Sequence, residues 1–162
     1  MKVMIAIDGS ECSKHAVDFL IRRPWGADDS FLVSHVVEPI PVDVGIAYVP
    51  AAYSQADGAA FEQAEALLKV VAEEIKAALP GHAVDTKVVF GTVTSELVDL
   101  AQDAGIDLIV MGSHGRKGFN RFLLGSVAEE VLKHAHCSVE IVKNVKETPC
   151  QDKSGHEASA GA

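Results

Sequence analysis

A glycine-rich segment in the second half of the chain carries residue types that bind phosphate groups. It runs from Gly112 to Ser126, has further glycines at positions 115 and 125, and contains the cations Arg116, Lys117 and Arg121. Glycine lets the backbone approach a ligand closely. The helix expected to open at Ser126 would present free N–H groups and a positive dipole end to an anion. The segment therefore predicts a cradle for nucleotide phosphates.

A second candidate site follows the first apolar run of the chain. Asp8 and Ser10 come directly after residues 3–7, which are all apolar. In an open α/β sheet, ligands bind beyond the carboxyl ends of the strands, where the strand order reverses. Asp8 could instead only cap the helix that follows it. Because the same chain also contains the glycine-rich segment, we favour ligand binding for Asp8.

Better-known phosphate motifs are absent from the sequence. It contains no G-x-x-x-x-G-K-[ST] and no G-x-G-x-x-G after an expected strand. A P-loop ATPase and a dinucleotide-dependent dehydrogenase are therefore disfavoured.

The glycine spacing is nevertheless specific. The pattern Gly112-x2-Gly115-x9-Gly125-Ser126 resembles the nucleotide loop of the universal stress protein family, and the opening Ile5-Ala6-Ile7-Asp8-Gly9-Ser10 resembles the first strand of that family. The resemblance covers Lys2 to Val145, nearly all of the part expected to fold.

This resemblance implies a sheet order of 3-2-1-4-5 and binding of ATP, or of AMP or ADP, with or without Mg²⁺. It places Ala6 and Asp8 against adenine and ribose, and the backbone of Val36 against adenine. We assign no catalytic or metal-ligating residue. The residues expected to bind the nucleotide are Ala6, Asp8, Val36, Met111, Gly112, His114, Gly115, Arg116, Gly125, Ser126 and Val127.

The elements that must position these residues alternate along the chain. Apolar, β-rich runs predict strands over 3–7, 31–37, 84–90, 107–111 and 138–142, and helical spacing predicts helices over 16–21, 61–79, 95–104 and 126–132. For the third helix, Thr94 or Ser95 is the expected N-cap and Gly105 the expected stop. Because parallel strands need helical crossovers, we expect an α/β fold: an open, five-stranded parallel, Rossmann-like sheet with helices on both faces.

Length and composition indicate one domain. The chain has 162 residues, of which 48% are hydrophobic and 23% charged, as in ordinary globular proteins. We expect a nucleotide-binding domain over residues 1–146 and a disordered tail over 147–162, which is rich in Ser, Gly and Ala. Residues 38–57 carry three prolines and are expected to form a long loop.

Charge and cysteine content limit the partners and the compartment. With 14 Lys and Arg against 23 Asp and Glu, the net charge of −9 disfavours nucleic acid as a partner. Three scattered cysteines indicate a reducing, cytoplasmic location, and no apolar run is long enough for a membrane span. His134, His136 and Cys137 could hold a metal, but a histidine near a helix C-terminus is favourable without one.

Three functions remain open. The first is an ATP-binding, cytoplasmic stress-response module that acts through nucleotide-dependent conformation or association with a protein partner. The second is a slow ATPase or adenylating enzyme, for which only Asp8, Ser10 and His114 are candidate catalytic groups. The third is an adaptor that binds protein through an edge strand or the 38–57 loop and does not use the nucleotide. The intact glycine segment favours the first.

The family resemblance also implies a homodimer formed through the last strand. Here Ser138 stands where a proline is common and Glu140 where an aliphatic residue is usual. A Glu140 pair near a two-fold axis would bring like charges together unless Lys143 or another cation pairs with them. We therefore expect a dimer that is weaker than is usual in the family and whose affinity increases at acidic pH.

Overall fold

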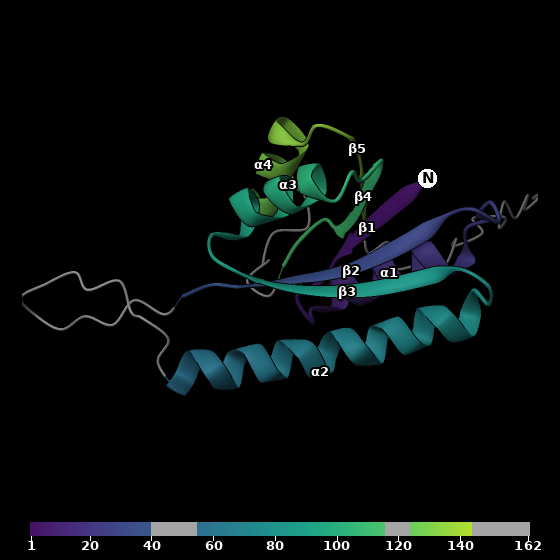
Figure 1. Ribbon diagram of the computed structural model, residues 1–162. Coiled ribbons are helices and arrows are strands. Elements are labelled where there is room, and N and C mark those ends of the chain that lie inside the picture. Colours follow the sequence, from purple (N-terminus) through teal and green to yellow (C-terminus); the bar gives the residue numbers. More distant parts are fainter. Residues whose placement is uncertain (40–54, 116–123, 144–162) are drawn as a thin grey trace, which may run out of the picture.

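Five parallel strands form the centre of the molecule. The computed structural model describes residues 1–39, 55–115 and 124–143. Neighbouring strands pair in parallel in the order β3-β2-β1-β4-β5 (Figure 1), which confirms the predicted fold class and strand order. The strands are β1 (Lys2–Ala6), β2 (Ser30–Val37), β3 (Ala83–Phe90), β4 (Leu108–Gly112) and β5 (Ser138–Val142).

Within the described residues, four helices connect the strands: α1 (Glu11–Arg22), α2 (Gln55–Ala78), α3 (Val93–Asp103) and α4 (Ser126–His134). Helix α1 starts earlier than predicted because Oγ of Ser10 accepts a hydrogen bond from the Ser13 N–H at 3.2 Å and caps it. Helix α2 begins inside the segment expected to be a loop. The remainder of that loop, the domain boundary at residue 146 and the tail over 147–162 lie outside the described residues.

Helix α3 also begins before its predicted start. Its N-cap is Thr92 and not Thr94 or Ser95, and the first intrahelical bond joins the Glu96 N–H to the Thr92 carbonyl at 3.0 Å. The predicted stop is confirmed: Gly105 has a φ of 62°, the left-handed conformation that glycine adopts after a helix.

The helices cover both faces of the sheet. Figure 1 shows α1 and α2 on one face and α3 and α4 on the other. Strand β1 serves both layers, because Val3 and Ile5 pack into the core under α1 and α2 while Met4 packs into the core under α3 and α4. All three side chains are fully buried, as expected for a strand in the middle of a parallel sheet.

The strand order reverses between β1 and β4. Ala6 at the end of β1 is the register partner of Met111 near the end of β4. Helix α1, which follows β1, covers one face of the sheet, and α4, which follows β4, covers the other. This divergence leaves a crevice at the carboxyl edge of the sheet.

Candidate functional site

A cavity of about 420 Å³ occupies this crevice. Asp8 after β1, Glu38 after β2 and Ser113 after β4 come together around it. Arg116 lies outside the described residues, as do Lys117 and Arg121. Every other residue expected to bind the nucleotide lines the cavity: Ala6, Asp8, Val36, Met111, Gly112, His114, Gly115, Gly125, Ser126 and Val127.

Small side chains form part of the cavity floor. Ala6 and Ser34 are register partners on β1 and β2, and both line the cavity. Two residues earlier along each strand the corresponding pair is Met4 and Leu32, which are larger and buried. The decrease in side-chain size at the end of the sheet leaves room for a ligand above the core.

The wall next to this floor is apolar. Val93 and Leu97, from the first two turns of α3, line the cavity with Val36 and Val127. An apolar slot of this kind suits a flat aromatic ring such as a nucleobase. We do not predict Val93 and Leu97 from the sequence, because their spacing is also that of ordinary core residues.

The lining also includes the N-terminus of α4. Gly125 is its N-cap and has no side chain with which to cap the helix. The first intrahelical bond joins the Glu129 N–H to the Gly125 carbonyl at 2.9 Å, so the N–H groups of Ser126, Val127 and Ala128 precede it. All three residues line the cavity, and such a helix end attracts an anion.

Gly112 has a packing role that the sequence did not predict. A β-carbon at this position would lie 2.7 Å from the carbonyl carbon of Cys12 and 2.8 Å from its carbonyl oxygen. Glycine is therefore required here because the backbone of α1 packs directly on β4. Gly112 also lines the cavity, so its place in the nucleotide site stays a prediction.

Gly115 and Gly125 bring parts of the site close to one another. A β-carbon on Gly115 would lie 2.9 Å from Oδ2 of Asp8, whose Oδ1 accepts a hydrogen bond from the Ser10 N–H at 3.0 Å. A β-carbon on Gly125 would lie 3.0 Å from the carbonyl oxygen of Ser113. The glycine spacing thus lets the segment after β4 pack between Asp8 and α4.

His114 contributes a buried polar atom that has no partner among residues 1–39, 55–115 and 124–143. Its Nδ1 lies 3.0 Å from Oγ of Ser113, whereas its Nε2 is buried and makes no hydrogen bond within these ranges. Burying such an atom without a partner costs free energy. His114 lines the cavity, so a ligand bound there would lie near this ring.

A second histidine, His35, also lines the cavity. Its Nδ1 lies 2.6 Å from the carbonyl oxygen of Ile7, so Nδ1 carries the proton and donates to that oxygen. This bond joins the end of β2 to the residue before Asp8. The sequence offers no periodic or motif signal for His35, because the contact depends on the pairing of β1 with β2.

The family model for "Universal stress protein family" matches residues 1–143 of the chain. The chain belongs to the universal stress protein family. The universal stress protein MJ0531 of Methanocaldococcus jannaschii is 37% identical over 147 residues, which cover 90% of this chain and 83% of the relative. The universal stress protein YxiE of Bacillus subtilis is 32% identical over 148 residues, covering 88% of this chain and 98% of the relative.

Solved structures show the same universal stress protein fold. The structure of the hypothetical protein MJ0577 matches with a TM-score of 0.75 and 27% identity, over 89% of this chain and 96% of that one. A universal stress protein solved in complex with cAMP matches with a TM-score of 0.61 and 25% identity, over 88% of this chain and 95% of that one.

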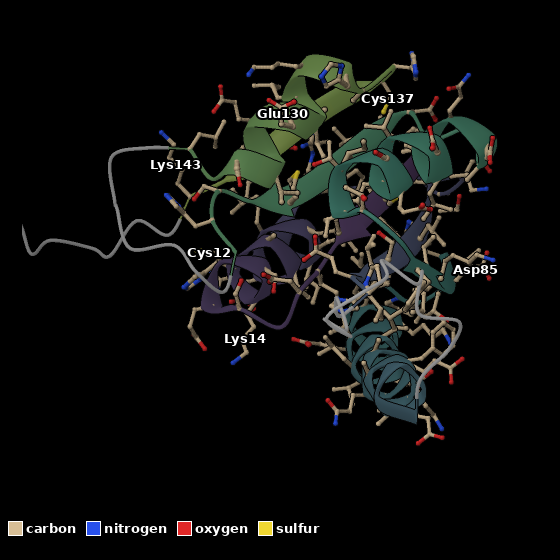
Figure 2. The ribbon with its side chains drawn as sticks, turned by 90° about the vertical axis from the view of Figure 1, so that its left-hand side faces the viewer. Cys12, Lys14, Asp85, Glu130, Cys137 and Lys143 are labelled. Atoms are coloured by element: carbon tan, nitrogen blue, oxygen red, sulfur yellow. The ribbon has the colours of Figure 1, made fainter. Side chains whose placement is uncertain are left out.

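Metal ligands are not gathered in the described part of this universal stress protein. Residues 1–39, 55–115 and 124–143 contain no group of three or more His, Cys, Asp or Glu side chains arranged to hold a metal ion. Burial raises the pKa of the Cys137 thiol, which disfavours the thiolate that metals require. Cys12 and Cys137 are free cysteines and lie far apart (Figure 2). Over the same ranges, no helix combines the length and apolar character that crossing a membrane requires.

Proposed function

We propose that this universal stress protein binds an adenine nucleotide, with ATP as the first candidate, and acts as a regulatory module. Its conformation or its association with a partner would depend on whether the nucleotide is bound. One observation carries the proposal: the cavity at the strand-order reversal is lined both by apolar side chains and by the uncapped N-terminus of α4. A nucleotide has the matching division into an aromatic base and an anionic phosphate group.

The polar groups of the cavity support this assignment. The unpartnered Nε2 of His114 and the N–H groups of Ser126 and Val127 can donate hydrogen bonds to phosphate oxygens. The carboxylate of Asp8 can accept hydrogen bonds from ribose hydroxyls. A relative with 25% identity has been solved in complex with cAMP, which supports an adenine nucleotide as the ligand class.

A regulatory role fits the site better than rapid hydrolysis. Phosphoryl transfer needs a group that orients or deprotonates the attacking nucleophile. Nδ1 of His114 contacts the Ser113 hydroxyl and not a carboxylate that would orient the ring as a base. We expect any release of phosphate to be far slower than about one per second, near the low end of typical enzyme turnover.

Association of two copies through β5 is part of the proposal. Strand β5 is at the end of the strand order, beside β4. Glu140 on this strand forms an ion pair with Arg23, the residue directly after α1. Arg23 is therefore a cation that pairs with Glu140, as a dimer through β5 requires. It balances the Glu140 carboxylate, which would otherwise face the Glu140 carboxylate of the second copy. The free thiols of Cys12 and Cys137 suit the cytoplasmic location that we propose.

Calorimetric titration tests the nucleotide proposal. The protein is titrated with ATP, ADP and AMP, each with and without Mg²⁺, and the ATP mixture is then assayed for free phosphate. We expect saturable binding and intact ATP. Absence of binding by all three nucleotides would contradict the proposal. Fast phosphate release that is lost in His114→Ala, with binding retained, would replace it with the enzyme alternative.

A further inference from the structure

The Ser113 side chain lies at the base of the cavity and is 3% exposed. Its Oγ is 3.0 Å from Nδ1 of the next residue, His114. The other ring nitrogen of His114, Nε2, is the buried atom without a partner. The hydroxyl of Ser113 and the open hydrogen-bonding position of His114 are therefore at opposite nitrogens of one ring.

The backbone holds Ser113 in place from two sides. Its N–H donates to the carbonyl of Val142 at the end of β5, at 2.9 Å, and its carbonyl accepts from the Gly125 N–H at the start of α4, also at 2.9 Å. Close packing of Gly125 on the Ser113 carbonyl leaves little room for either residue to shift. The Ser113 hydroxyl is thus presented to the imidazole from a fixed position.

The hydroxyl of Ser113 can serve the imidazole in either charge state. Facing an anionic oxygen, Nε2 must carry a proton in order to donate. In the neutral ring Nδ1 then has a lone pair and accepts a hydrogen bond from the Ser113 hydroxyl. In the charged ring Nδ1 instead donates a hydrogen bond to the hydroxyl oxygen. A serine hydroxyl does both, so His114 can keep one orientation and one donor toward the ligand.

His35 and His114 both line the cavity, but their Nδ1 atoms have different hydrogen-bond partners. Nδ1 of His35 faces the carbonyl of Ile7, which only accepts, so the neutral ring has its proton on Nδ1 and an acceptor at Nε2. His114 has a hydroxyl in the equivalent position and is free to place its proton on Nε2. Of the two rings, His114 is therefore the one suited to an anionic group.

We infer that Ser113 is a positioning residue for nucleotide binding. Resting on the function proposed above, the inference is that the Ser113 hydroxyl orients the His114 ring so that the Nε2 proton points toward a phosphate oxygen. Ser113 thereby favours phosphate-bearing ligands without contacting the phosphate itself.

Affinity for ATP in a double-mutant cycle tests this inference. We expect Ser113→Ala to weaken ATP binding about five- to tenfold, the loss typical of one hydrogen bond. Ser113→Thr, which keeps the hydroxyl, should bind nearly as the wild type does. In a His114→Ala background, Ser113→Ala should have no further effect, because there is no ring left to orient. Ser30→Ala, at the start of β2, controls for loss of a serine hydroxyl elsewhere.

The ring itself gives an independent measurement. Nitrogen NMR of labelled histidine distinguishes the two neutral tautomers, and bound wild type should show His114 protonated at Nε2. Ser113→Ala should change the Nδ1 resonance of His114 in the bound state, because the hydrogen bond between that nitrogen and the Ser113 hydroxyl is lost.

Two results would overturn the inference while the proposed function stands. One is wild-type ATP affinity in Ser113→Ala. The other is an equal loss caused by Ser113→Ala with and without His114, which would indicate a structural effect only. Failure of the wild type to bind any adenine nucleotide would instead contradict the proposed function, and this inference with it.

Discussion

Gly115 lies directly against the carboxylate of Asp8, although the two residues are more than a hundred positions apart in the chain. A β-carbon at position 115 would be 2.9 Å from Oδ2 of Asp8. The same carboxylate is tied through Oδ1 to the backbone N–H of Ser10. The contact joins the turn after β1 to the segment after β4, and it makes the side-chain size at position 115 a determinant of where Asp8 points.

We therefore expect Gly115→Ala to weaken ATP binding about tenfold while the fold survives, because a displaced Asp8 loses about one hydrogen bond to the ligand. Gly115→Val should eliminate measurable binding. Gly58→Ala is the matched control, since Gly58 is exposed in α2 with no atom within 4 Å of the added carbon. Titration calorimetry measures both. Unchanged affinity in Gly115→Val would remove Asp8 and this segment from the site.

Gly112→Ala should act on stability and not primarily on binding. Its added carbon would lie 2.7 Å from the backbone of Cys12, and backbone atoms cannot move aside as a side-chain tip can. Helix α1 would have to shift from β4, at a cost of about 1–3 kcal/mol in the free energy of unfolding. Urea denaturation measures this cost. Stability equal to that of the wild type would contradict this close packing of α1 on β4.

The ion pair between Arg23 and Glu140 should control self-association. Arg23→Gln leaves the carboxylate of Glu140 without its partner on β5, so two copies that approach through β5 would repel each other. We expect several-fold weaker dimerisation than in the wild type, measured by sedimentation at several protein concentrations. Glu140→Gln removes the charge itself and should dimerise at least as well as the wild type. A wild-type protein that stays monomeric at high concentration would contradict association through β5.

The N-terminal amino group gives a pH-dependent prediction. It lies 2.5 Å from Oδ1 of Asp29, and this hydrogen bond lowers the pKa of Asp29 and raises the pKa of the amino group. The stabilisation is lost as pH falls through the lowered Asp29 pKa, below its ordinary 3.8. It is also lost as pH rises through the raised amino pKa, above its ordinary 8.0.

Asp29→Asn tests this assignment. The asparagine side chain can still accept a hydrogen bond from the Gly26 N–H, but it cannot form an ion pair with the N-terminal amino group. The difference in unfolding free energy between wild type and variant should be largest near neutral pH and should shrink toward both extremes. Because the amino group is exposed and the Asp29 carboxylate is only partly buried, the difference should be small and should decrease with added salt. A pH-independent difference would contradict the ion pair.

Much of the architecture was predictable because it depends on local pattern. Apolar runs such as 3–7, bounded by polar or glycine residues, identify strands that are buried on both faces. Their alternation with helices requires a parallel sheet. The helix starts were harder, since Ser10 and Thr92 compete with neighbouring polar residues and only backbone geometry decides between them.

The sequence by itself was enough to predict a nucleotide site and to show its glycine spacing, because the chemical properties of glycine, serine and aspartate are known without the fold. Only the tertiary structure decided what each glycine accommodates: the backbone of α1 at Gly112, the Asp8 carboxylate at Gly115 and the Ser113 carbonyl at Gly125. It likewise decided that Val93 and Leu97 face the cavity, that His35 bonds to Ile7, and that Arg23 reaches Glu140. The physical reason is that these contacts join residues on different elements, and their distances exist only once the strands are paired and the helices packed.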